Sequence, residues 1–406
     1  RHPPQPPMKS GPDSTTPSAS LRLSAVAHDW WPLAASWALM GLEMPAISIV
    51  VGHLPQPEVM LAAFAGIAFP LALLVEAPII MMLAASTALS RDLATFLALQ
   101  RFMTILSIAL TVVHAIIAFT PVWPLIIVPV LDIPPQVDPA AREAFAWLLP
   151  WTWAIADRRF RQGMLIHFGR REVVAFGTAI RLIATIGTLI LLAGMEFPGA
   201  VVATAALSVG VIVEAAYVRF RSVPVVREVL RRAPERSSPL TLRRLLAFYI
   251  PLALTPMLVL AAQPLATAGI TRMPEAIPSL AVWGPLGGIV FLTRSVGIAF
   301  NEVSIRLAAR PGSRRPLRQF AWGVGLLFSG VLACIALSPL SDLWFREVVD
   351  LDLPLVELGV STLWLAIPIP LLTFLQSMYQ GLLVDAHRTR PITESVAIYL
   401  TLTTIG

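Results

Sequence analysis

The sequence contains almost no lysine or cysteine, and this scarcity removes several classes of protein at once. Its only lysine is Lys9, so the chain has no GxxxxGK phosphate-binding loop, and ATP-driven work by such a loop is excluded. The single cysteine, Cys334, lies in an apolar run and has no partner for an internal disulfide. The HExxH, CxxC and GxSxG motifs are also missing, so the sequence predicts no metal, no cofactor and no enzyme activity.

Charged residues are scarce as well. They make up 13% of the 406 residues, whereas hydrophobic residues make up 56%. Soluble domains usually carry about 25% charged residues, so the lipid bilayer is the expected solvent and partner of this chain. The formal net charge of +6 comes from arginines in the short gaps between apolar runs, a pattern typical of membrane topology rather than of nucleic-acid binding.

Apolar runs long enough to cross the hydrocarbon core as helices recur along the chain. We therefore predict an all-α polytopic membrane protein with ten complete spans, near residues 30–52, 60–88, 94–120, 144–157, 173–194, 198–218, 245–270, 276–303, 317–340 and 355–384. The span near 144–157 is the weakest, because prolines interrupt the region around it. An eleventh span begins near Pro391 and is cut off at Gly406, and we expect twelve in all.

The arginines alternate between the two ends of these spans in the way that the positive-inside rule describes. If the N-terminus is placed in the cytoplasm, nearly all of the basic residues outside the spans fall on the cytoplasmic side. Arg142, Arg272 and Arg346 are the exceptions. The pattern predicts a multi-pass integral membrane protein with a cytoplasmic N-terminus, which we assign to a bacterial inner membrane.

Two halves of the chain match at a nearly constant offset. Pro32-Leu33-Ala34 recurs as Pro251-Leu252-Ala253, Glu76 aligns with Arg294, and Gln162-Gly163 recurs as Gln380-Gly381. We predict two six-helix bundles related by a pseudo-twofold axis, a plan common among secondary transporters. The predicted divisions are a disordered tail over 1–26, a first bundle over 27–219, a basic linker over 220–244, and a second bundle, incomplete here, over 245–406.

Four charged residues fall in the middle band of the predicted spans: Glu43, Glu76, Arg181 and Arg294. Charge inside a bilayer is costly, so such residues usually face a cavity or a partner. One interpretation is a substrate and ion pathway, in which Glu76 and Arg294 form a gate pair or the arginines bind an anion. Glu43 or Glu76 would then bind a coupling proton or cation. The alternative is static ion pairs that only hold helices together.

Glycines interrupt the span near 276–303. Gly284, Gly287 and Gly288 surround Pro285, and they mark either a hinge or a close contact between helices.

Several stretches resemble the multidrug and toxic compound extrusion (MATE) proteins and their wider superfamily. Within that group, the progressive ankylosis proteins are the most similar. The matching stretches are His28-Asp29-Trp30-Trp31-Pro32-Leu33, Glu76-Ala77-Pro78, Ser90-Arg91-Asp92 and Leu246-Ala247-Phe248-Tyr249-Ile250-Pro251-Leu252-Ala253-Leu254. The resemblance covers most of the chain, although none of these stretches is diagnostic by itself.

The resemblance implies a V-shaped monomeric exporter that works by alternating access through a central cavity. It also implies that Glu43 matches a coupling carboxylate in the first helix of MATE proteins, and that the substrate is a small organic or phosphate-containing anion, as in ankylosis-type proteins. Three alternatives stay open: a proton- or sodium-coupled multidrug or organic cation antiporter, a lipid-linked glycan flippase, and a non-transporting membrane scaffold.

Overall fold

The computed structural model describes residues 21–230, 240–308, 310, 312–386 and 390–405, and every regular element among them is a helix. This confirms the all-α prediction. The first half contains α1 Leu23–Gly41, α2 Glu43–Gly52, α3 Pro57–Leu61, the π-helix η1 Ala62–Ala68, α4 Phe69–Ile80, α5 Met82–Leu89, α6 Leu93–Phe119, η2 Trp123–Ile127, α7 Val128–Leu131, α8 Asp138–Trp147, α9 Leu149–His167, α10 Arg171–Ala193, α11 Gly199–Pro224 and η3 Val225–Leu230.

The second half repeats this order until the described residues end. It contains α12 Leu242–Ile270, α13 Ala276–Ile298, α14 Phe300–Ala308, α15 Arg314–Ala336, α16 Leu340–Asp342, η4 Leu343–Val348, α17 Leu353–Ala366, α18 Ile369–Asp385 and α19 Arg390–Ile405. Within the described part of the chain, 9 runs of helix are long and apolar enough to cross a membrane, and they coincide with nine of the ten complete predicted spans.

The structure moves three predicted boundaries. The weak span near 144–157 corresponds to α8 and α9, which follow one another from Asp138 to His167 and are more polar than the other spans. The predicted tail over 1–26 is too long, because α1 already begins at Leu23. The predicted linker over 220–244 starts too early, because helix continues through η3; its residues 231–239 lie outside the described residues, as do residues 1–20 of the tail.

The internal repeat is visible in local geometry that the sequence matches did not include. Asp132, after α7, and Asp350, after η4, both have positive φ, of 52° and 62°. Gly163 of α9 lies against the backbone of α5 at Leu83 and the side chain of Ser86, and Gly381 of α18 lies against Ser304 of α14 in the same way. Since Ser86 and Ser304 are related by the same offset as the two glycines, the same helix crossing is built twice.

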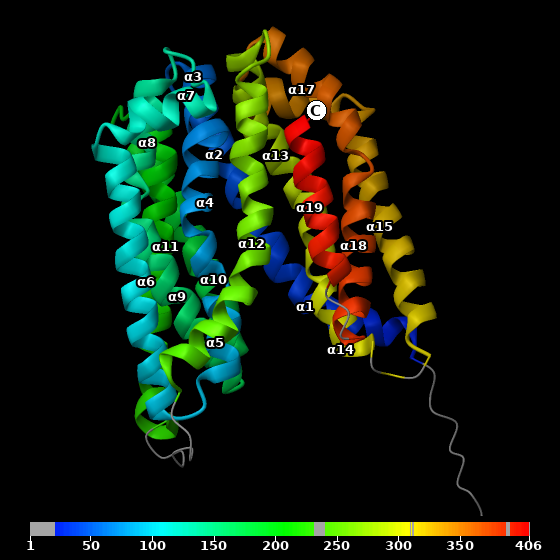
Figure 1. Cartoon of the computed structure of the whole chain (residues 1–406). Helices are drawn as coiled ribbons and strands as arrows, with labels where there is room; N and C mark the ends of the chain where they lie inside the picture. The colour runs from blue at the N-terminus through cyan, green and yellow to red at the C-terminus, as the bar shows by residue number, and fades with distance from the viewer. Residues whose placement is uncertain (1–20, 231–239, 309, 311, 387–389, 406) are drawn as a thin grey trace, which may run out of the picture.

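The two halves form two bundles that exchange their first helices. The bundles meet at the end where α3, α7 and α17 lie, and they stand apart at the end where α5 and α14 lie (Figure 1). Helix α1 belongs to the first half, but it packs in the second bundle, where the Trp30 Nε1–H donates to the carbonyl of Val296 at 2.8 Å. Helix α12 belongs to the second half, but it packs along α4 of the first bundle.

A proline creates one of the hydrogen bonds that anchor α12. Pro70 has no N–H, so the carbonyl of Gly66, four residues earlier, loses its usual helical donor. The hydroxyl of Thr267 on α12 donates to this carbonyl at 2.6 Å. The Tyr249 hydroxyl makes a second such bond, to the carbonyl of Pro78. Helix breaks in the first bundle therefore supply acceptors for the helix that crosses over from the second half.

Two of the arginines that the charge pattern assigned to the outer side lie at helix ends. Arg142 donates through Nε to the carbonyl of Ala118 at 2.8 Å, at the C-terminal end of α6. Arg272 donates through Nη2 to the carbonyl of Val130 at 3.0 Å, in α7. Carbonyls at the end of a helix carry partial negative charge and lack helical donors. These contacts give both residues a local reason to occupy the end of the molecule that otherwise holds few arginines.

The repeated helix crossing leads to a first prediction, on stability. We expect Gly163→Val to lower the free energy of unfolding by about 1–3 kcal/mol or more, because a side chain there would meet the backbone of α5. Gly187→Val on α10 is the matched control, since no atom lies within 4 Å of a Cβ at that position. Thermal unfolding of the purified protein in detergent measures both. Equal melting temperatures for the two variants would contradict the helix packing described here.

Candidate functional site

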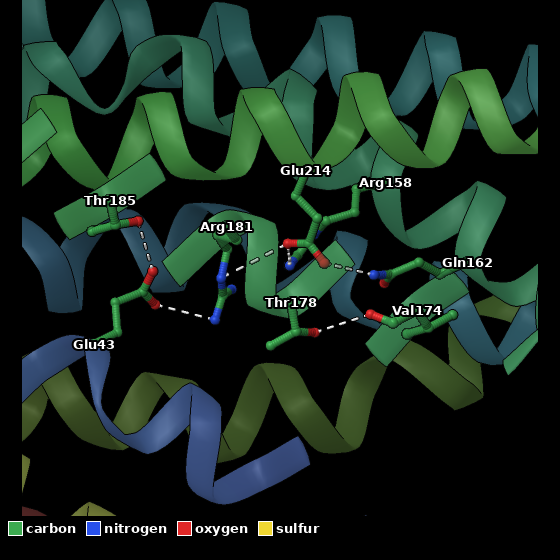
Figure 2. A network of polar contacts seen from close by, with 8 residues as sticks. All are labelled: Glu43, Arg158, Gln162, Val174, Thr178, Arg181, Thr185 and Glu214. Carbon is green, nitrogen blue, oxygen red and sulfur yellow. Dashed lines mark hydrogen bonds and ion pairs between the residues drawn. The ribbon is translucent and has the colours of Figure 1, made fainter. Parts of the chain in front are cut away.

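Glu43 occupies the break in the first membrane span. Helix α1 ends at Gly41 and α2 begins at Glu43, two residues before Pro45, whose missing N–H cannot donate to the carbonyl of Gly41. The Glu43 side chain points into the first bundle (Figure 2). Its Oε2 lies 3.2 Å from Nη2 of Arg181, and its Oε1 accepts a hydrogen bond of 3.1 Å from the Thr185 hydroxyl.

Glu214 is the centre of the same network. Its side chain is 0% exposed, and it accepts hydrogen bonds from Arg158 Nη1 and, at 2.9 Å, from Gln162 Nε2. Arg181 Nε lies 3.8 Å from its Oε2, so Arg181 bridges Glu43 and Glu214. Figure 2 shows this continuous chain of polar contacts, running from Thr185 through Glu43, Arg181 and Glu214 to Gln162.

Close packing of helices α10 and α11 makes the network possible. Gly210 of α11 lies directly against Thr185 and Arg181, and Gly177 of α10 lies against Glu214, so a side chain at Gly210 would collide with its neighbours. Helices with small residues at their contact approach closely in a membrane. The two carboxylates and the two guanidinium groups balance one another, which removes most of the cost of holding charge at this depth.

Glu76 of α4 lies in the same bundle but outside this network. Its side chain is buried, at 1% exposure, and neither carboxylate oxygen has a hydrogen-bond partner within the described structure. Thr152 is its neighbour, but the Thr152 hydroxyl lies 3.2 Å from Nδ1 of His114. The other nitrogen of His114 lies 2.8 Å from the carbonyl of Phe145, so it carries the hydrogen, and Nδ1 of the neutral ring accepts from Thr152.

The structure brings two of the four predicted site residues together. Glu43 and Arg181 form an ion pair, whereas no ion pair in the described residues joins Glu76 to Arg294, so the gate pair stays a prediction. Arg294 lies on α13 in the second bundle, 5.6 Å from the ring centroid of Phe291. The two residues occupy equivalent positions in their halves, but Glu76 is buried in the first bundle, whereas Arg294 is half-buried on α13.

Sequence reasoning missed four members of the network: Arg158, Gln162, Thr185 and Glu214. The predicted span near 198–218 places Glu214 close to its end, but α11 continues to Pro224, so this carboxylate lies further from the helix end than the predicted span implied. A signal was present in the sequence. The predicted spans near 173–194 and 198–218 are joined by a short connection, and such neighbours pack side by side and antiparallel, which brings Glu214 and Arg181 to a similar depth.

The glycines of α13 have a packing role in the structure. Helix α13 runs unbroken through all three, so the predicted interruption is wrong. Gly284 lies against Ala65 of η1 and Gly288 against Pro45 of α2, while no atom lies within 4 Å of a Cβ built at Gly287. Gly284 and Gly288 therefore let the second bundle approach the first closely, and their role as a hinge stays a prediction.

Solved structures with similar folds are MATE transporters. No protein-family model matches the chain, and no curated protein matches its sequence. The chain is similar to an inward-facing multidrug resistance MATE family transporter of the MOP superfamily, with a TM-score of 0.69 and 16% identity over 92% of this chain and 88% of that chain. An outward-facing structure of such a transporter gives a TM-score of 0.61 and 18% identity over 94% and 84% of the chains.

A third similar structure is that of the MATE multidrug transporter DinF-BH, solved as a complex. Its TM-score is 0.62, with 14% identity over 98% of this chain and 88% of that chain. These likenesses show that the chain has the MATE fold, which confirms the predicted resemblance at the level of fold. The ankylosis subgroup stays a prediction.

The central position of Glu214 leads to the second prediction. We expect Glu214→Gln to lower the free energy of unfolding by about 3–5 kcal/mol, because it leaves Arg158 and Arg181 short of negative charge inside the bundle. Glu347→Gln is the matched control, since it removes only an exposed ion pair with Arg346, worth about 0–1 kcal/mol. Chemical denaturation in detergent measures both. If the two variants were equally stable, Glu214 would not organise the network.

Proposed function

We propose that the chain is a secondary transporter that moves its substrate by alternating access between the two bundles. The observation that supports this most is the path of the first span. Its first part, α1, packs in the second bundle, its second part, α2, packs in the first bundle, and the break between them lies directly before Glu43. Any change in the angle between the bundles must flex this span next to the charge network, so movement and charge state are linked.

The shape of the molecule supports an inward-open state. The bundles stand apart at the end with α5 and α14, where the arginine-rich connections lie, and the positive-inside rule assigns that end to the cytoplasm (Figure 1). The TM-score is also higher against the inward-facing transporter, at 0.69, than against the outward-facing one, at 0.61. We assign the chain to an inward-open conformation on this basis.

Charge balance favours an anionic substrate, exported by this movement. In the first bundle, Glu43 and Glu214 are already paired with Arg181 and Arg158, so this network has no surplus negative charge for an organic cation. In the second bundle, Arg294 contributes a positive charge at the position that is equivalent to Glu76. An anion gains from such a charge in a low-dielectric site, whereas an organic cation is repelled by it.

Transport measurements test the substrate class. We expect protein reconstituted in proteoliposomes to move small anions such as pyrophosphate, citrate or a nucleotide, and we expect Arg294→Gln to reduce this flux by about tenfold or more, since a partly buried charge contact is worth about 1.5–3 kcal/mol. Arg294→Lys is the matched control, because it keeps the charge and should retain part of the flux. Flux of an organic cation that survives Arg294→Gln but is lost in Glu43→Gln would support a cation antiporter instead.

Glu76 is our candidate for the group that binds a coupling proton. Glu43 already has Arg181 and Thr185 as partners, whereas neither oxygen of Glu76 has one in the described structure. A buried carboxylate without a partner is stabilised by taking up a proton, because the neutral form loses less solvation energy. The Thr152 oxygen, which donates its own hydrogen to His114, keeps a lone pair that a protonated Glu76 can use.

A gradient experiment tests this role. We expect Glu76→Gln, which mimics the protonated side chain, to abolish the acceleration of flux by a proton gradient while substrate exchange without a gradient continues. Glu143→Gln, a change at an exposed carboxylate of α8, is the matched control and should leave the acceleration intact. Uptake is measured in the same proteoliposomes with the gradient imposed and then collapsed by an ionophore. Full acceleration in Glu76→Gln would remove Glu76 from the coupling step.

A further inference from the structure

A pocket of about 250 Å³ lies outside the bundle interior, where the start of α10 meets the end of α11. Its lining comes from two short segments, residues 170–173 and 220–225, and consists of Arg170, Val173, Phe220, Arg221, Val223, Pro224 and Val225. Pro224 ends α11, and the chain continues as the π-helix η3. The pocket therefore lies where the helix changes from α to π after this proline, at the arginine-rich end of the molecule.

The lining separates into a charged part and an apolar part. Arg170 and Arg221 are exposed, no ion pair of the described residues involves either of them, and the acidic neighbour Glu172 does not line the pocket. Val173 and Val225 are buried beneath them, at 3% and 5% exposure. Phe220 is 75% exposed, so its ring has little protein to pack against. The pocket thus offers positive charge next to the exposed apolar surface of Phe220.

We propose that this pocket binds the headgroup of an anionic phospholipid of the cytoplasmic leaflet. The two guanidinium groups suit a phosphate, because arginine presents paired donors to its oxygens. Phe220 and Val223 suit the start of an acyl chain beside that phosphate. Basic pockets between membrane helices at the cytoplasmic surface hold lipid headgroups in this manner. The volume is below the roughly 300–1,000 Å³ of pockets for drug-sized ligands, which fits a headgroup rather than a transported molecule.

A soluble phosphate is the other source of the same chemistry, and the position of the pocket favours the lipid. α10 and α11 are both membrane-spanning helices, and the pocket opens at their arginine-rich ends, where headgroups lie. A free phosphate would use the arginines but would leave Phe220 and Val223 facing lipid or water without a contact. A phospholipid contacts both parts of the lining: its phosphate contacts the arginines, and its acyl chain contacts Phe220 and Val223. The acyl chain also holds the headgroup at the depth of the pocket.

Native mass spectrometry of the full chain in detergent tests the proposal without measuring transport. At about 0.15 M ionic strength, where loose surface attraction is screened, we expect more phosphatidylglycerol than phosphatidylcholine to remain bound. We expect the double variant Arg170→Gln/Arg221→Gln to reduce phosphatidylglycerol binding by about thirtyfold, since each of the two basic residues near the surface contributes about 1 kcal/mol. The matched control, Arg314→Gln/Arg318→Gln, removes equal charge from exposed positions on α15 and should bind as the wild type does.

Three results would overturn the proposal. The first is equal loss of phosphatidylglycerol in the two double variants, which would indicate only general attraction to the basic end. The second is equal retention of phosphatidylcholine and phosphatidylglycerol by the wild type. The third is displacement of the lipid by millimolar inorganic phosphate, which would assign the pocket to a soluble anion. Thermal unfolding checks that the variants are folded, and we expect no change because both arginines of the pocket are exposed.

Discussion

The cost of placing charge inside a bilayer is the constraint on which the rest of this structure depends. Arg158, Arg181, Glu43 and Glu214 all lie within the first bundle, and each would be costly there without its partners. The partners come from four different helices, so the network holds α2, α9, α10 and α11 in one arrangement. The same constraint explains Gly177 and Gly210. The charged side chains of the network reach one another only if α10 and α11 pack closely, and glycine allows this. Interior charge therefore fixes helix positions that uniform apolar packing would leave free.

A second constraint is that each backbone carbonyl in the membrane needs a donor. Prolines within the helices free particular carbonyls, and the structure uses them at the contacts between halves. The Gly66 carbonyl, left without its helical donor by Pro70, accepts from Thr267 of α12. In the other direction, Trp30 of α1 donates to the carbonyl of Val296. Because each half sends its first helix into the other bundle, α1 and α12 join the two bundles.

The sequence predicts the spans and the repeat well, because both depend on features that can be read directly along the chain: length, hydropathy and spacing. The shared positive φ of Asp132 and Asp350, and the shared packing of Gly163 and Gly381, agree with the repeat offset read from the sequence. The site is harder to predict, because depth in the membrane does not determine which way a side chain faces. Glu76 and Arg294 lie at equivalent positions of the repeat, yet they belong to different bundles and form no ion pair with each other in the described residues. Glu214 was misplaced because the predicted span ended before the helix does.

The two halves share an arrangement of helices, but they carry different residues at the positions of the charge network. At the repeat offset of 218 residues, Glu43 corresponds to Ala261, Arg158 to Gln376, Arg181 to Tyr399 and Glu76 to Arg294. These three charges of the first bundle's network are thus replaced by neutral residues, and the buried carboxylate by an arginine. Gln162 is retained as Gln380, which contacts Asn301 instead of a carboxylate, and Thr185 is retained as Thr403. At these positions, the first half therefore holds paired charges and a buried carboxylate where the second half holds neutral residues and an arginine, so the repeated backbone carries different charges in its two halves.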